Sequence, residues 1–253
     1  MAKTWGRLRR LNPTKTNSLA LAALSPLVKP LLSPLIKFRW AGGVFVPKSG
    51  SAILVANHIS SLDPVLLGLF LAHNGRWPHY LARANLWDNR LLRHLLETSG
   101  QIPVFRDSDQ ASDALRQAKA SLASGNTVII YPEGTITFDP QEWPMTIHTG
   151  VARLAIATGA PVIPVGQWGA NFVLPPRKIR PLKLRRHLVT TVAGEPLEIP
   201  RGEEEDRELV ARVSKQIFDA IWRQTCLARG ESGPDTIWSQ RFNKRVACDD
   251  VLY

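Results

Sequence analysis

A histidine and an aspartate with four residues between them stand in the stretch from Asn57 to Asp63 (NHISSLD). Imidazole exchanges a proton near neutral pH, and a neighbouring carboxylate can fix its tautomer and stabilise its charged form. An apolar run at 52–56 precedes the stretch, and a helix-like run at 64–71 follows it. In an α/β domain, the turn between a strand and the next helix is a usual place for reactive side chains. His58 and Asp63 are therefore a candidate general base and its orienting carboxylate.

These seven residues also have a purely structural interpretation. Asp63 is followed by Pro64, and this pair is typical of a helix N-cap with proline at the first helical position. A histidine beside the start of a helix often lies on the surface without a chemical role. Both interpretations remain open on these residues alone.

The elements around the stretch alternate between strand-like and helix-like patterns. The predicted strands cover 44–46, 52–56, 79–82, 127–131, 162–165 and 188–194, with a short strand or loop at 102–105. The predicted helices cover 64–72, 86–96, 108–123, 150–158 and 201–229. This alternation predicts an α/β fold with a mainly parallel central sheet flanked by helices. We expect the domain to occupy residues 41–229, followed by a tail at 230–253 that shows no clear pattern.

Loops that follow parallel strands open at the same sheet edge and can form one site. Arg106 ends a short apolar run, and a guanidinium there could hold phosphate through two hydrogen bonds, although the pattern taken alone favours a surface arginine. Glu133 follows the predicted strand at 127–131 and lies between a proline and a glycine. A turn explains the proline and the glycine, but it does not explain the carboxylate.

Together these segments resemble the glycerolipid acyltransferase family, which includes the 1-acylglycerol-3-phosphate acyltransferases. The family's motifs match, in order, the His58/Asp63 pair, the run from Gly100 to Arg106, the run from Tyr131 to Thr135 (YPEGT), and the run from Val162 to Pro164. The first and third motifs are the specific ones. The similar part spans about residues 40–200.

The resemblance implies transfer of a fatty acyl group from an acyl thioester to the sn-2 hydroxyl of 1-acyl-sn-glycerol 3-phosphate, which gives phosphatidic acid. His58 would act as the base and Asp63 would orient it. Arg106 would bind the acceptor phosphate, while Glu133, Gly134 and Thr135 would shape the acceptor pocket. Acyl-CoA or acyl-carrier protein would be a co-substrate, with no metal and no bound cofactor required.

The third motif departs from the family pattern after Thr135. Arg and Ser often follow that threonine in the family, whereas Ile136 and Thr137 follow it here. The same chemistry on another lysophospholipid or a glycolipid is therefore an alternative. A protein of a different class, which binds anionic membrane or nucleic acid through charge and does no catalysis, is a further alternative, but it would have no use for the His58/Asp63 pair.

The net charge of +11 predicts a polyanionic partner. The sequence has no zinc-finger spacing, no aromatic-rich RNA-binding signature and no basic region with heptads, so we expect an anionic membrane surface and no nucleic acid. The two cysteines, Cys226 and Cys248, indicate no disulfide framework and fit a reducing compartment.

The residues before the domain are basic and then apolar. Residues 1–17 form a basic arm without the features of a secretory signal. Residues 18–40 are apolar but contain Lys29 and three prolines, which argue against a single spanning helix. We expect two short amphipathic helices in the membrane interface, with a hydrophobic hairpin packed on the domain as the alternative. The expected location is the cytoplasmic face of the cell membrane, as a peripheral or monotopic protein.

Overall fold

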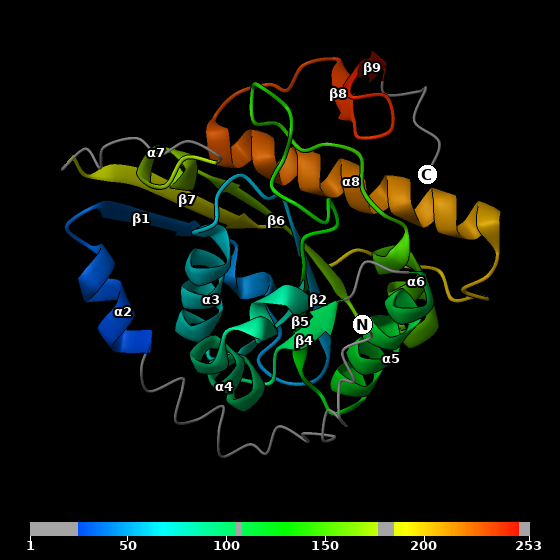
Figure 1. Ribbon diagram of the computed structural model, residues 1–253. Helices are drawn as coiled ribbons and strands as arrows, with labels where there is room; N and C mark the ends of the chain where they lie inside the picture. Colours follow the sequence, from blue (N-terminus) through cyan, green and yellow to red (C-terminus); the bar gives the residue numbers. More distant parts are fainter. Residues whose placement is uncertain (1–24, 105–107, 177–184, 248–253) are drawn as a thin grey trace.

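The computed structural model describes residues 25–104, 108–176 and 185–247. Its main feature is a seven-stranded sheet with helices packed against both faces (Figure 1). The strands lie in the order β1-β7-β6-β2-β5-β3-β4. Their bounds are β1 Ile36–Ala41, β2 Ala52–Ala56, β3 Pro78–Arg83, β4 Ile102–Val104, β5 Thr127–Ile130, β6 Val162–Trp168 and β7 His187–Ala193.

The helices connect and cover these strands. The α-helices are α2 Ser25–Leu32, α3 Asp63–His73, α4 Arg90–Thr98, α5 Ser108–Ala123, α6 Gly150–Thr158, α7 Ala170–Val173 and α8 Arg207–Arg229. Two short 3-10 helices, η1 Gly43–Phe45 and η2 Ala84–Asp88, precede β2 and α4. The strands β8 Thr236–Ser239 and β9 Lys244–Ala247 form a separate antiparallel hairpin.

Strand β2 lies at the centre of the sheet and is buried along its whole length. Ile53 and Val55 face a core that includes side chains of α5, α6 and α8, whereas Leu54 and Ala56 face a second core that includes side chains of α3. Burial on both faces explains why the run at 52–56 is apolar without alternation. The α/β fold with a mainly parallel sheet is confirmed.

The sheet is parallel from β6 to β4, but its other edge runs in the opposite direction. β7 pairs antiparallel with β6, and β1 pairs parallel with β7. β2, β5 and β6 therefore point the same way, and the segments that follow them begin at one sheet edge. Those segments start at Asn57, Tyr131 and Gly169.

The prediction of two helices over residues 18–40 is wrong at its second helix, because residues 36–40 belong to β1. The run from Ile36 to Trp40 alternates apolar and basic residues, which is the period of a strand. α2 covers part of the first predicted helix, and residues 18–24 lie outside the described residues. Lys29 of α2 lies over the ring of Trp40, with 4.5 Å from Nζ to the ring centroid, so the two elements pack together. Among the described residues, no helix is both long enough and apolar enough to cross a bilayer.

Three further expectations are corrected. Residues 44–46 do not form a strand, because most of them belong to η1. The predicted helix at 86–96 is divided at Asn89, whose side chain accepts hydrogen bonds from the N–H groups of Leu91 and Leu92 and so begins α4 afresh. The C-terminal tail carries the β8–β9 hairpin up to Ala247; residues 248–253 lie outside the described residues.

Candidate active site

His58 and Asp63 are brought together by the turn between β2 and α3. The distance from His58 Nδ1 to Asp63 Oδ2 is 2.9 Å. The Asp63 side chain is fully buried, while the His58 side chain keeps 16% of its surface exposed. Because the carboxylate accepts, the proton sits on Nδ1, and Nε2 is left as the basic nitrogen. The pair predicted from the sequence is therefore assembled with the geometry of a base and its orienter.

Asp63 is not the helix cap that its proline neighbour indicates. The helix cap position is Leu62, and Asp63 is already the first helical residue. Its Oδ2 atom also accepts hydrogen bonds from the backbone N–H groups of Ile59 at 2.6 Å and Ser60 at 2.7 Å. The Asp63 carboxylate therefore binds both the imidazole of His58 and the backbone of the turn.

The carboxyl group of Glu133 binds the backbone of His58. Its Oε1 atom accepts the N–H of His58 at 2.8 Å, and its Oε2 atom accepts the N–H of Met145 at 3.1 Å. The residue is 1% exposed. That Glu133 helps to shape the acceptor pocket stays a prediction; what the structure shows is that both of its carboxylate oxygens accept hydrogen bonds inside the protein. Glu133 positions His58 and the loop containing Met145.

The environment of Glu133 opposes its negative charge. Burial raises the pKa of its carboxyl group to about 8. The two backbone N–H donors act against that rise, whereas the nearby carboxylates of Asp63 and Asp139 add to it. The protonation of this buried group is therefore sensitive to pH in the neutral range.

The imidazole ring of His58 rests on a tyrosine. The ring of Tyr131 stacks on it with a centroid distance of 4.4 Å and an interplanar angle of 27°. Desolvation raises the pKa of Tyr131 well above its ordinary value, so its hydroxyl group is protonated and donates to Gln167 Oε1 at 3.2 Å. The stack restricts the ring from one side, and Asp63 fixes its rotation.

Gln167 connects this tyrosine to the turn, and sequence reasoning missed it. Its side-chain amide donates to the carbonyl of Asp63 at 3.3 Å, and its backbone exchanges two hydrogen bonds with the side chain of Asn57, at 2.7 and 3.0 Å. The signal was present in the sequence, since a fully buried glutamine interrupts the apolar strand β6. Buried polar side chains of this kind need partners.

Gly134 and Thr135 form the outer part of the third motif. Gly134 has a φ of +69°, and a Cβ atom there would lie 3.0 Å from the ring of His148, so only glycine fits without strain. Thr135 Oγ1 accepts a hydrogen bond from Arg83 Nη2 at 2.8 Å. Arg83, at the end of β3, is exposed and was also missed. Arg106 lies outside the described residues.

The C-terminal hairpin contacts the loop that follows β5. The side-chain amide of Gln240 donates to the carbonyls of Glu133 at 3.1 Å and Thr146 at 2.7 Å. The N–H of Thr146 donates to the carbonyl of Trp238 at 3.0 Å. No signal for this contact was found in the sequence, because it joins segments about a hundred residues apart.

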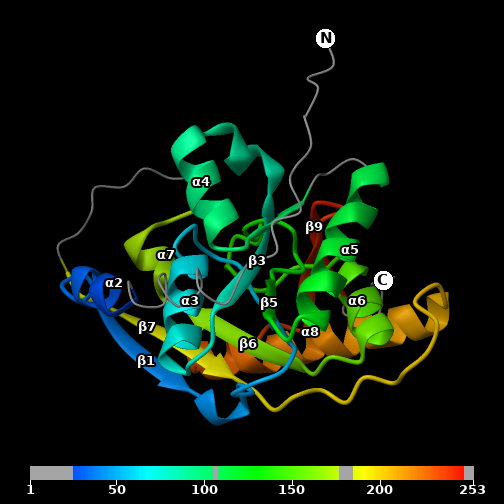
Figure 2. The same ribbon diagram turned by 90° about the horizontal axis from the view of Figure 1, so that it is seen from below.

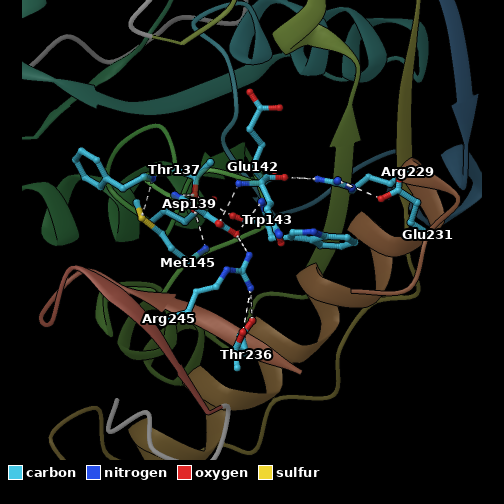
Figure 3. Close-up of polar contacts among 12 residues, drawn as sticks. Thr137, Asp139, Glu142, Trp143, Met145, Arg229, Glu231, Thr236 and Arg245 are labelled. Carbon is cyan, nitrogen blue, oxygen red and sulfur yellow. Dashed lines mark hydrogen bonds and ion pairs between the residues drawn. The ribbon is translucent and has the colours of Figure 1, made fainter. Parts of the chain in front are cut away.

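Two arginines fix the rest of that loop (Figure 3). Arg245 of β9 reaches back to the buried carboxylate of Asp139 in an ion pair and donates to the carbonyl of Thr236 at 2.8 Å. The guanidinium carbon of Arg229 lies 4.0 Å from the ring centroid of Trp143 and 3.7 Å from that of Trp168. The loop that follows β5 is thus fixed by contacts with α8 and with the β8–β9 hairpin.

The arrangement suits proton transfer by a single base. A hydroxyl group placed at Nε2 of His58 could give up its proton there, and the Asp63 carboxylate would stabilise the imidazolium that forms. Within the described ranges, no group of three or more His, Cys, Asp or Glu residues is arranged to hold a metal ion.

The chain is similar to proteins of one family. The family model described as Acyltransferase matches residues 37–168, which is 132 of the 253 residues. The chloroplastic 1-acyl-sn-glycerol-3-phosphate acyltransferase of Brassica napus is 26% identical over 56% of this chain and 40% of its own length. The 1-acyl-sn-glycerol-3-phosphate acyltransferase of Borreliella burgdorferi is 27% identical over 54% of this chain and 53% of its own length. The matches thus span about half of each relative or less.

A solved structure shares the fold. The crystal structure of the 1-acyl-sn-glycerophosphate acyltransferase of Thermotoga maritima superposes with a TM-score of 0.60 at 22% identity, covering 81% of this chain and 78% of that one. This likeness supports the architecture. The family match includes His58, Asp63 and the third motif, and on that match the chain belongs to the Acyltransferase family.

Proposed function

We propose that this protein transfers an acyl group from an acyl thioester to the sn-2 hydroxyl of 1-acyl-sn-glycerol 3-phosphate. The observation that carries the proposal is the pairing of His58 Nδ1 with the buried Asp63 carboxylate at 2.9 Å, which leaves Nε2 as a base. The relatives from Brassica napus and Borreliella burgdorferi, whose names state this activity, support the choice of acceptor.

In the proposed reaction the acceptor hydroxyl is the nucleophile. Its oxygen attacks the thioester carbonyl carbon while Nε2 of His58 takes its proton. The tetrahedral intermediate then collapses, the carbon–sulfur bond breaks, and the imidazolium returns the proton to the leaving thiolate. Asp63 keeps the imidazole in the correct tautomer and stabilises its charge in both steps. No serine or cysteine of the protein takes part.

The acceptor phosphate needs a cation close to the histidine. Arg106, from the second motif, is our proposed ligand, and Arg83 joins it because its guanidinium already contacts Thr135 of the third motif. Gly134 and Thr135 would form the surface beneath the headgroup. The donor is acyl-CoA or an acylated carrier protein, and no resident metal or cofactor is proposed.

The acceptor is a lipid, so we propose that the protein works at a membrane. Its charge of +11 favours an anionic surface over a neutral one. We place it on the cytoplasmic face of the cell membrane, as a peripheral or monotopic protein. We assign it no nucleic-acid partner.

An assay of thiol release tests the function directly. The full-length protein is given acyl-CoA or acylated carrier protein together with a panel of lysophospholipids and glycolipids. We expect release with 1-acyl-sn-glycerol 3-phosphate and no release by the His58→Ala variant, whose thermal unfolding is measured to show that it folds. Faster release with another acceptor would show that the assigned acceptor is wrong. Turnover by His58→Ala would overturn the mechanism.

A further inference from the structure

Helix α4 presents leucines that the described part of the protein does not cover. The nine-residue helix has leucines at positions 91, 92, 95 and 96, which share one side, yet none of its residues is buried. Leu91 is 82% exposed and Leu95 is 49% exposed. Such large apolar side chains normally face the core. In Figure 2, α4 lies at the margin of the molecule, on the side away from α8.

The helix is nevertheless fixed to the domain. Asn89 caps its first turn, and Arg93 Nε donates to the carbonyl of Trp87 at 2.7 Å. Trp87 itself is buried, with 3% of its surface exposed. Leu91 and Leu95 therefore lie exposed on an element that is anchored to the domain.

Other exposed apolar side chains gather around the same sheet edge. Phe138, 45% exposed, follows Thr137, whose N–H donates to the carbonyl of His58 at 2.8 Å. Leu174, also 45% exposed, accepts a hydrogen bond on its carbonyl from Ser60 Oγ at 2.7 Å. Each lies on a segment that follows a parallel strand and touches the catalytic turn.

Helix α4 belongs to this group through Arg83. β3 ends at that residue, η2 and α4 follow directly, and the guanidinium contacts Thr135. Exposed apolar residues thus follow the carboxyl ends of β3, β5 and β6, on the side of the sheet where His58 follows β2. An apolar surface of this kind marks an interaction site.

We propose that this surface docks on an anionic lipid bilayer, with Leu91 and Leu95 of α4 entering the interface. The occupant is argued from charge and position. Arg90 lies beside Leu91 at the start of the helix, and the exposed Arg83 precedes it at the end of β3, while Glu97 is the one acidic residue of α4; cations beside exposed leucines suit an anionic interface. The whole chain carries +11. This inference rests in part on the proposed function, since a lipid acceptor would then reach His58 without leaving the membrane.

This docking surface is formed by residues that follow β3, β5 and β6, outside residues 18–40. It lies within the folded domain, so it fixes which side of the domain faces the membrane, whereas a terminal anchor alone leaves that orientation free. The alternative occupants of the surface are residues 1–24 of the same chain and a second copy of the protein. In either case the leucines would be unavailable to lipid.

The test compares two exposed apolar residues that lie at opposite ends of the parallel strands. Leu91 lies on the side of the carboxyl ends, and Val44, 85% exposed, lies in η1 before the amino end of β2. Full-length protein, Leu91→Asp, Leu91→Asp with Leu95→Asp, and Val44→Asp are sedimented with vesicles of phosphatidylcholine alone or mixed with phosphatidylglycerol. We expect the Leu91 variant to bind the mixed vesicles about tenfold more weakly and the double variant more weakly still.

Val44→Asp should bind as the unchanged protein does, and all of these proteins should bind less to vesicles without phosphatidylglycerol. Thermal unfolding of each variant serves as the control for a folding defect. Because Leu91 is exposed, its replacement should change the unfolding temperature little. Unchanged vesicle binding by the folded double variant would overturn the proposal, as would an equal loss with Val44→Asp. Stronger binding by the double variant would point to residues 1–24 or a second copy as the occupant and also overturn it.

A second measurement separates this proposal from the function beneath it. Acyl transfer is compared between an acceptor embedded in vesicles and a short-chain acceptor dissolved in buffer. The double variant should lose activity with the embedded acceptor and keep it with the soluble one. If the unchanged protein transfers acyl groups to neither acceptor, the proposed function fails, while the vesicle sedimentation still decides whether the surface docks.

Discussion

The carboxylate of Glu133 accepts a hydrogen bond from the backbone N–H of His58 at 2.8 Å. The third motif thereby acts on the first through the main chain, while Asp63 acts through the imidazole ring at 2.9 Å. Glu133 thus fixes the position of the His58 backbone, and Asp63 fixes the orientation of its ring.

Glu133→Gln should lower kcat with little change in KM. Above about pH 8, where Glu133 is ionised, its carboxylate offers two acceptors and an amide offers only one, so the amide NH₂ group would face the N–H of His58 or of Met145. We expect a loss of about tenfold or more in kcat, because an unpaired buried donor costs roughly 1–3 kcal/mol. Steady-state kinetics would measure it. Glu205→Gln, at an exposed position, serves as the matched control, and an unaltered kcat in Glu133→Gln would refute the positioning role.

The same carboxyl group should make stability depend on pH. Its pKa is raised to about 8, above the ordinary value near 4.5 that the unfolded chain has. Between those values the folded protein holds a proton that the unfolded chain has lost. The contribution of Glu133 to the free energy of unfolding is therefore fully present below about pH 4.5. It declines as the pH rises towards 8, by up to about 1.4 kcal/mol per pH unit.

Thermal or urea unfolding of the unchanged protein and of Glu133→Gln across this range would measure that effect. We expect the decline with rising pH to be shallower in the variant, since glutamine does not titrate. Parallel curves for the two proteins would show that Glu133 titrates normally. Glu205→Gln should reproduce the unchanged curve.

Asp63→Asn should nearly abolish acyl transfer. The amide would disturb the contact with His58 Nδ1 and could favour the tautomer with the proton on Nε2, which cannot accept one. A decrease of about 10³–10⁴-fold in kcat is expected from the corresponding change in other His–Asp pairs. Asp219→Asn removes an exposed carboxylate that pairs with Lys215 on α8 and should leave kcat unaltered. Asp63→Asn activity within a few fold of the unchanged protein would exclude the orienting role.

Gln240→Ala should reduce kcat although the residue lies on the C-terminal hairpin. Its amide holds the carbonyls of Glu133 and Thr146, so its loss loosens the loop that positions His58. We expect a decrease of about three- to thirtyfold in kcat, with KM for the acyl donor nearly constant. Gln216→Ala is the control, because its amide donates to the carbonyl of Glu198 away from the site. Equal effects of the two variants would show that Gln240 contributes only to general stability.

Part of this architecture is encoded in short-range patterns. The run at 52–56 predicts a buried strand because both faces of β2 meet cores, and the His58/Asp63 spacing predicts a turn that joins the two side chains. These features depend on neighbouring residues, whose geometry is set by the local backbone.

Features that depend on distant partners were not predictable in the same way. Nothing near Glu133 in the sequence indicates that its carboxylate meets the N–H of His58, 75 positions earlier. The leucines before β1 favour an amphipathic helix, whereas the strand forms through its partner β7, about 150 positions later. The strands of the hairpin are four residues long with mixed polarity, so their pattern carries little information.

The contact between Gln240 and Glu133 also orders events during synthesis. The ribosome releases the sheet strands β1 to β7 before it releases residue 240, so the sheet can begin to pack while the loop after β5 still lacks its last hydrogen bonds. A nascent chain should therefore acquire its fold first and its ability to react with thioesters only near the end of translation.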